Sequence, residues 1–251
     1  MARVLGIFLV LLAVGSAKAT DIDYFSGLEW VEPAPGQEIR LLAIYPPELP
    51  ANLEMASYRY LTPKEDSLTR HGALLVHAMG IDGEWLQEQM VSSGQAIVMP
   101  VFEHNPERLA YLKGVETAAR ENKLGLWANG PDFLHCADYA RNAFDSFAII
   151  QGPLVDAARV RGTVYLNFGE DWRTDFTAKI TSRNFRKLPQ DLQNTLDQLI
   201  DSDKPDTVIE AIIEARGWVY FEGGPMIEIK EAAQLDFYQP ASPFIKGGCQ
   251  G

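Results

Sequence analysis

The sequence is poor in cysteine and lacks the short motifs that mark several classes of enzyme. Its 251 residues include two cysteines and four histidines, and none of them has the spacing of a zinc site. It has neither the Gly-Lys-Ser/Thr loop that cradles nucleotide phosphates nor the Gly-x-Ser-x-Gly turn of serine hydrolases. The sequence therefore favours neither a structural zinc protein nor a hydrolase of these two kinds.

Positive charge is also scarce. The chain has 22 Lys and Arg against 34 Asp and Glu, which gives a formal net charge of -12. Non-specific affinity for nucleic acid comes mainly from neutralising phosphates with basic side chains. The charge balance therefore disfavours nucleic acid as a partner, unless a local basic patch offsets it.

A long apolar run occurs at the amino terminus. Residues 1–19 combine a basic start, an apolar stretch too short to cross a bilayer comfortably, and a small-x-small cleavage site at Ala17-Lys18-Ala19. This pattern predicts a signal peptide, secretion across the inner membrane to the periplasm, and no membrane span after cleavage; an uncleaved anchor is the alternative. Export would place Cys136 and Cys249 in an oxidising compartment, and the sequence leaves open whether they pair.

The remaining chain predicts a mainly β fold with added helices (α+β), arranged as two small five-stranded barrels in tandem. Short strand-like segments alternate with turn residues in both halves, and "RGWVYFEGGPMIEI" is typical of a hairpin. Asn105 and Pro106 predict the start of a helix in the first half. The expected boundaries are a signal peptide at 1–19, a first barrel at 20–128, a linker at 129–143, a second barrel at 144–238 and a flexible tail at 239–251.

Three segments of the first half carry a family resemblance: "GQEIRLLAIYPPE", "DGEWLQEQMVSSGQAIV" and "ETAARENKLGLWA". Together they resemble the staphylococcal-nuclease-like, or thermonuclease, family over about residues 25–128. The resemblance implies a barrel of the oligonucleotide/oligosaccharide-binding (OB) type. Active members hydrolyse phosphodiesters with a calcium ion held by aspartates, a glutamate that helps activate water, and two arginines that stabilise the phosphate. Strand order gives the second half a resemblance to an OB barrel as well.

The resemblance also implies that the active site is degenerate. Arg40 matches the first arginine and Glu48 matches the glutamate. Tyr45 and Leu28 stand where the two metal-binding aspartates are expected, and Ala73 stands where the second arginine is expected. We therefore expect Arg40 and Glu48 to be vestigial catalytic residues that form an ion pair, with no metal ligand and no cofactor.

Two alternatives remain open at this point. The first is an active calcium-dependent nuclease in which Asp21, Asp23 or Glu29 replaces the lost metal ligands. The second is a structural component of the cell envelope without a ligand. The predicted absence of catalysis favours a binding or interaction module over both.

The second half contains a candidate binding surface. The segment from Arg159 to Lys187 contains seven basic and three acidic residues, and aromatic residues are interleaved with them. Aromatic side chains on a barrel face beside cations are suited to stacking sugars or bases. The ligand-binding candidates are Tyr165, Trp172 and Arg173, and the alternative is a solvated turn between core strands. A protein or an oligosaccharide is the expected partner.

Overall fold

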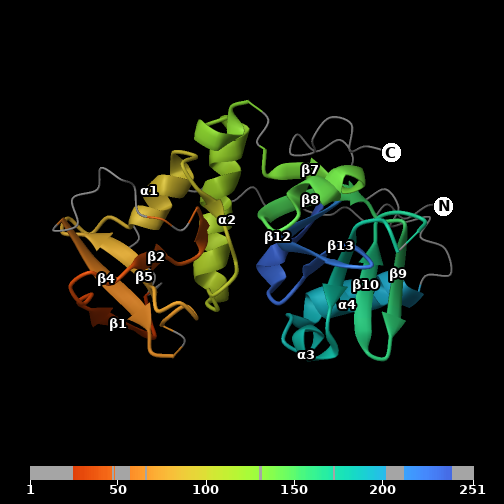
Figure 1. The fold of residues 1–251 in the computed structure, drawn as a ribbon, viewed down its shortest axis with the longest axis horizontal. Coiled ribbons are helices and arrows are strands. Elements are labelled where there is room, and N and C mark those ends of the chain that lie inside the picture. Colours follow the sequence, from red (N-terminus) through yellow and green to blue (C-terminus); the bar gives the residue numbers. More distant parts are fainter. Residues whose placement is uncertain are drawn as a thin grey trace, which may run out of the picture.

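The computed structural model describes residues 25–46, 48, 57–65, 67–129, 132–171, 173–201 and 212–238. The predicted signal peptide, the predicted tail and Trp172 lie outside the described residues. The fold is mainly β with several helices, and it forms two lobes with the long helix α2 (Pro106–Glu121) between them (Figure 1). Among the described residues, no helix has the length and apolar character that crossing a membrane requires.

The first lobe is an OB-like arrangement of short strands and two helices. A four-stranded sheet has the order β1-β4-β5-β2, in which β1–β4 and β4–β5 are antiparallel and β2–β5 is parallel. A separate pair joins β3 to β6. The elements besides α2 are β1 (Leu28–Val31), β2 (Ile39–Leu41), β3 (Ile44–Tyr45), β4 (Tyr58–Pro63), β5 (Leu74–Gly80), α1 (Leu86–Ser92), β6 (Ile97–Val98) and η2 (Gly125–Trp127).

Helix α2 begins where the sequence predicts. The Asn105 side chain accepts a hydrogen bond of 2.8 Å from the backbone N–H of Arg108, and Pro106 is the first helical residue. Leu109 and Leu112 are buried against the core of the first lobe. The helix ends at Glu121, and its other faces remain available for contacts with the second lobe.

The second lobe is built on an eight-stranded sheet of order β7-β8-β12-β13-β11-β10-β9, with β14 paired to β12. Within the described residues these pairings do not close into the expected five-stranded barrel. The long strand β12 explains the difference, because its first part pairs with both β8 and β14 and its later part pairs with β13. The strands are β7 (Leu134–Cys136), β8 (Phe147–Pro153), β9 (Asp156–Val160), β10 (Thr163–Asn167), β11 (Thr177–Ile180), β12 (Ile212–Glu222), β13 (Gly224–Glu228) and β14 (Leu235–Tyr238).

Short helices cover this sheet, and one of them occupies the segment predicted as a linker. Residues 129–143 contain β7 and the 3₁₀ helix η3 (Ala137–Ala143) rather than a simple connection. Side chains three residues apart share one face of a 3₁₀ helix, so Ala137, Ala140 and Ala143 all pack into the core of the lobe. The other helices are α3 (Ser182–Phe185), α4 (Gln190–Asp201) and η4 (Ala232–Gln234).

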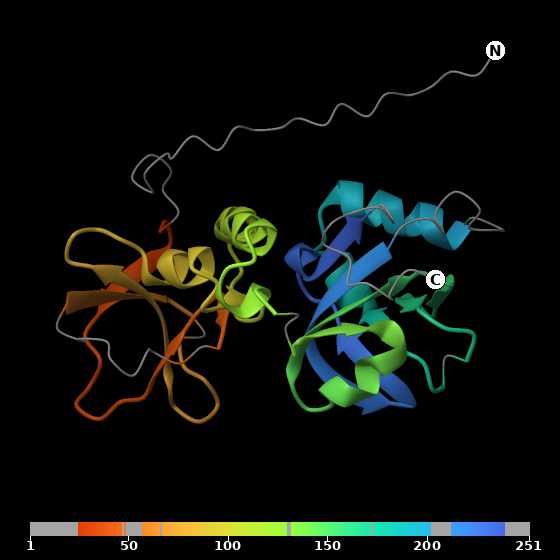
Figure 2. The same cartoon turned by 90° about the horizontal axis from the view of Figure 1, so that it is seen from above.

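The two lobes share a hydrophobic cluster besides the core that each has of its own. Ile97, Met99 and Trp127 of the first lobe pack in one buried cluster with Phe147 and Ile149 of β8. Figure 2 shows the two lobes from above, with α2 at their junction. Because apolar side chains from both lobes are buried in this cluster, separating the lobes would expose them to water.

Candidate functional site

Arg40 and Glu48 come together as expected. The Arg40 guanidinium forms an ion pair with Glu48 and donates a second hydrogen bond, of 2.7 Å, from Nε to Glu38. The Arg40 side chain is 32% exposed, and both glutamates are more exposed. Two carboxylates therefore face one guanidinium, so its donors are engaged within the protein and the surrounding charge is negative.

Tyr45 occupies the position that the resemblance assigns to a metal-binding aspartate. It pairs with Ile97 in the short β3–β6 ladder. Its ring lies against Phe147 of β8, with 5.2 Å between the ring centroids. The partly buried Tyr45 ring thus packs against the cluster shared by the two lobes, and strand β3, which carries it, contributes to their junction.

The other two altered positions are also apolar. Leu28 begins the edge strand β1 and is paired with Pro63 of β4. Ala73 is buried, directly before β5. Neither side chain can bind a cation or a phosphate.

The described side chains do not fit a calcium ion at this place. Calcium takes six to eight oxygen ligands, with carboxylates prominent among them. Glu29, one of the proposed replacements, forms an ion pair of 3.1 Å with Lys64, while Asp21 and Asp23 lie outside the described residues. Nowhere in the described part of the chain do three or more His, Cys, Asp or Glu side chains gather as a metal site would require.

The binding candidates of the second lobe lie on different elements. Tyr165 is on β10, beside Lys179 of β11, on the side of the sheet opposite the core residues Val164 and Leu166. A hydrogen bond to Glu222 of 2.7 Å raises the pKa of Lys179, against the opposing effect of burial. Arg173 is instead exposed in the loop between β10 and β11, and Trp172 lies outside the described residues.

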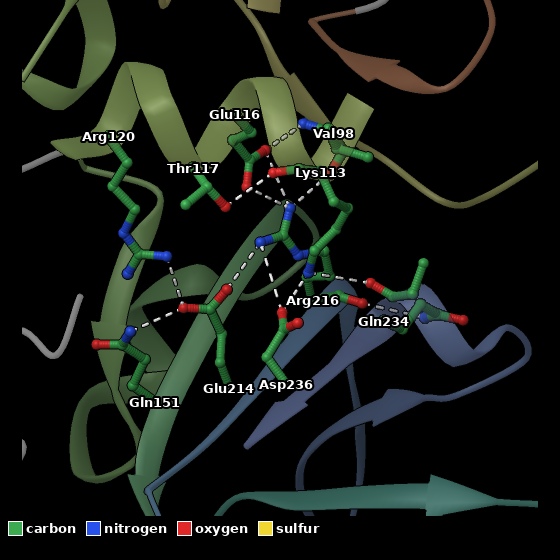
Figure 3. Close-up of polar contacts among 11 residues, drawn as sticks. Val98, Lys113, Glu116, Thr117, Arg120, Gln151, Glu214, Arg216, Gln234 and Asp236 are labelled. Atoms are coloured by element: carbon green, nitrogen blue, oxygen red, sulfur yellow. Dashed lines mark hydrogen bonds and ion pairs between the residues drawn. The ribbon is translucent and has the colours of Figure 1, made fainter. Parts of the chain in front are cut away.

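Sequence reasoning missed a buried network of charges between the lobes (Figure 3). Arg216 of β12 lies at its centre. One terminal nitrogen donates hydrogen bonds to the backbone oxygen of Val98 at 3.1 Å and to Glu116 of α2 at 3.0 Å. The other donates to Glu214 at 2.7 Å. A single side chain of the second lobe thus binds both a strand and a helix of the first.

Further contacts extend this network. Glu214 also accepts hydrogen bonds from Arg120 of α2 at 3.0 Å and from Gln151 of β8 at 2.8 Å. Lys113 of α2 forms an ion pair with Asp236 of β14. The six charged members are Lys113, Glu116, Arg120, Glu214, Arg216 and Asp236, and we call them the interlobe charge network. Its three acids and three bases balance, which burial of charge requires.

The electrostatics of the network favour the charged forms. Burial alone would raise the pKa of Glu214, but Arg120 and Arg216 outweigh it and lower the pKa to about 2. Burial likewise acts to lower the pKa of Arg216, and its carboxylate neighbours, Glu116 first, raise it instead. Both groups are therefore ionised at neutral pH while fully buried.

One local signal of this network was present in the sequence. Glu214 and Arg216 interrupt the apolar stretch "IIEARGWVYF" at positions two apart, so they project from the same face of a strand. Charged residues inside a buried strand require partners. The partners on α2 are about 100 residues distant in sequence, and no local pattern identifies them.

Cys136, at the end of β7, is disulfide-bonded. The other cysteine of the sequence is Cys249, which lies outside the described residues.

Comparison with known families supports the resemblance for part of the chain. Residues 52–129 match the family described as staphylococcal nuclease homologue, which is about a third of the sequence. The match includes β4, β5, α1 and α2 and the altered position Ala73. The match begins after Arg40, Tyr45 and Glu48. It therefore supports the similarity of the later strands and helices and does not include these three positions. A search among curated proteins found no match.

Proposed function

We propose that this staphylococcal-nuclease-like chain does not hydrolyse phosphodiesters and that it acts as an exported binding or interaction module. The observation that carries the proposal is the position of Tyr45. Its ring packs on Phe147 in the cluster that joins the lobes, where an active member would present a carboxylate to calcium. A phenol side chain packed against an apolar cluster does not supply the carboxylate oxygens that calcium takes as ligands.

The environment of Arg40 supports the same proposal. An arginine that stabilises a developing negative charge must direct its donors at the reacting group. Arg40 instead directs them to Glu38 and Glu48. Removal of one preorganised donor typically lowers the rate by about 10²- to 10³-fold, and Ala73 replaces the second expected arginine.

Export is supported by the amino-terminal pattern and by the disulfide of Cys136, because structural disulfides persist in oxidising compartments. Binding is supported by the second lobe, whose strands β12 and β14 are joined to helix α2 of the first lobe by the interlobe charge network. Function placed in loops on a rigid scaffold is a common arrangement. The ligand candidates Tyr165, Trp172 and Arg173 belong to this lobe.

A nuclease assay tests the proposal. We expect the purified mature protein to leave single-stranded DNA intact in the presence of calcium, and Glu48→Gln and Glu38→Gln to give the same result. Glu38→Gln is a matched control, because Glu38 binds the same guanidinium without matching a catalytic residue. Calcium-dependent cleavage that Glu48→Gln abolishes and Glu38→Gln preserves would show that the nuclease alternative is correct.

Restoring the aspartate at position 45 should also fail to restore a metal site. Tyr45→Asp places a carboxylate in the apolar cluster beside Phe147, so we expect the free energy of unfolding to fall by about 2–3 kcal/mol. Calorimetric titration should detect no calcium binding. Tyr139→Asp is the control, since Tyr139 is 63% exposed and the substitution should cost little. Calcium uptake by a stable Tyr45→Asp protein would contradict our account of this position.

A further inference from the structure

The second lobe has a pocket that none of the predicted site residues occupies. It lies between η3 and the loop joining β10 to β11, and its volume is about 140 Å³. Phe168, Phe176 and Pro225 contribute its apolar lining, and Asp138, Arg141 and Asp175 contribute charged groups. The loop is the one that contains the predicted ligand residue Arg173.

Fixed side chains and a braced loop preform the pocket. Phe168 and Phe176 are buried core residues whose ring centroids lie 4.9 Å apart. Asp175 accepts a hydrogen bond of 2.9 Å from the backbone of Asp171 at the other side of the loop. Its carboxylate covers Gly169 so closely that a Cβ there would lie 2.0 Å from an Asp175 oxygen. Because these groups are already ordered, binding a ligand in the pocket costs little conformational entropy.

The charges at the pocket favour a cation. The Asp138 side chain makes no hydrogen bond or ion pair within the described part of the chain. Arg141 is engaged: it donates a hydrogen bond of 3.2 Å to the Thr174 carbonyl and lies 5.4 Å from the centre of the Phe221 ring. Two carboxylates and one guanidinium leave a local charge of -1, on a chain whose total is -12. An anionic ligand would be repelled both by the charge at the pocket and by the net charge of the chain.

Exposed aromatic side chains adjoin Arg141, which lines the pocket. Arg141 lies over the Phe221 ring, and Phe144, which is 58% exposed, packs edge-on against Phe221 at 5.0 Å. Phe221 is itself 38% exposed. Clustered exposed aromatics indicate an interaction surface, and their ring faces attract cations.

We infer that this pocket binds a lysine or arginine side chain of a basic peptide segment in a partner protein. Such a side chain has a cationic head for Asp138 and an apolar stem that can lie against the small accessible part of the Phe168, Phe176 and Pro225 lining. A neutral sugar would gain nothing from the charge of the Asp138 carboxylate. The inference rests on the proposed binding function and specifies the class of its partner.

Calorimetric titration of the full mature protein with acetyl-trilysine amide tests the inference, with acetyl-trinorleucine amide as the uncharged comparison. We expect saturable binding of the lysine peptide and none of the norleucine peptide. Asp138→Asn should weaken binding at least tenfold, and raising the salt from 0.05 to 0.5 M should weaken it too. Glu121→Gln removes an exposed carboxylate of α2 and should leave the affinity unchanged.

Other results would overturn the inference. These are no binding of the lysine peptide, equal binding of both peptides, or equal losses in Asp138→Asn and Glu121→Gln, which would indicate general attraction to an acidic protein. Saturable binding of chitotetraose that Asp138→Asn abolishes would assign the pocket to a sugar instead. A nuclease assay on the same preparation distinguishes failure of the proposed function from failure of this inference. Cleavage of DNA would contradict the proposed function, and it would not affect the peptide-binding result.

Discussion

Replacing Arg216 by alanine should lower the free energy of unfolding by about 3–5 kcal/mol, the largest effect that we expect of any single substitution in this protein. The Arg216 side chain is 1% exposed and lies among Glu116, Glu214 and Asp236. Without it, Glu116 and Glu214 stay buried and lose one of the cations that balance them, and Glu116 loses the guanidinium that binds it. An uncompensated buried charge is costly even where the intact pair contributes little net stability.

Urea denaturation at neutral pH measures this effect, with Arg159→Ala as the matched control. Arg159 forms an exposed ion pair with Asp197 of α4, and exposed pairs contribute at most about 1 kcal/mol. If the two substitutions cost the same, the interlobe charge network does not stabilise the junction. A change in the slope of the denaturation curve would further indicate that the lobes separate before they unfold.

Glu103→Gln should have the second largest effect, and this effect should depend on pH. Glu103 accepts hydrogen bonds from His77 at 2.8 Å and from Arg108 at 3.0 Å, and all three side chains are buried. Burial alone would raise the pKa of Glu103, but these two partners lower it to about 2. In the variant the Arg108 charge stays buried without its carboxylate, and we expect a loss of about 3–5 kcal/mol at pH 7.

The direction of the pH dependence follows from this lowered pKa. A carboxylate whose pKa falls from 4.5 to about 2 on folding contributes its full stabilisation above pH 4.5, and loses it as the pH falls toward 2. The wild-type protein should therefore lose about 3 kcal/mol through Glu103 over this range, and the variant should not. Burial lowers the pKa of His77 below its usual 6.5, against the opposing effect of Glu103, which adds a loss of stability below that pH.

Denaturation series from pH 7 to pH 2.5 would measure this difference. The gap in stability between wild type and Glu103→Gln should narrow as the pH falls. The free energy of unfolding of Glu121→Gln, a substitution at an exposed position, should change with pH as that of the wild type does. A gap that stays constant down to pH 2.5 would show that Glu103 is not the ionised partner that we describe.

Local patterns in the sequence predicted much of the fold. Asn105 and Pro106 identified the start of α2, and the paired glycines at 223 and 224 identified the turn between β12 and β13. These features depend on backbone conformations that a few neighbouring residues decide. The strand-like segments likewise predicted a mainly β fold with helices.

Features that depend on distant partners were not predictable in this way. Gly, Pro and polar residues in 129–143 suggested a linker, because no local pattern shows that Ala137, Ala140 and Ala143 are buried in a core formed by distant strands. Tyr45 was expected at the position of a lost metal ligand, but its contact with Phe147 needs the second lobe. The pocket beside η3 forms where η3, the loop between β10 and β11, and β13 meet in the folded chain. No local sequence pattern indicates this meeting.

The position of α2 has a consequence for how the protein can be divided. A gene fragment ending after Trp127 would encode the whole nuclease-like match except its last two residues. It would also present to water the apolar residues Ile97 and Met99, together with a helix whose Glu116 had lost its guanidinium. Moving either lobe alone into another protein would therefore require redesigning the apolar and charged surface that it buries here against the other lobe.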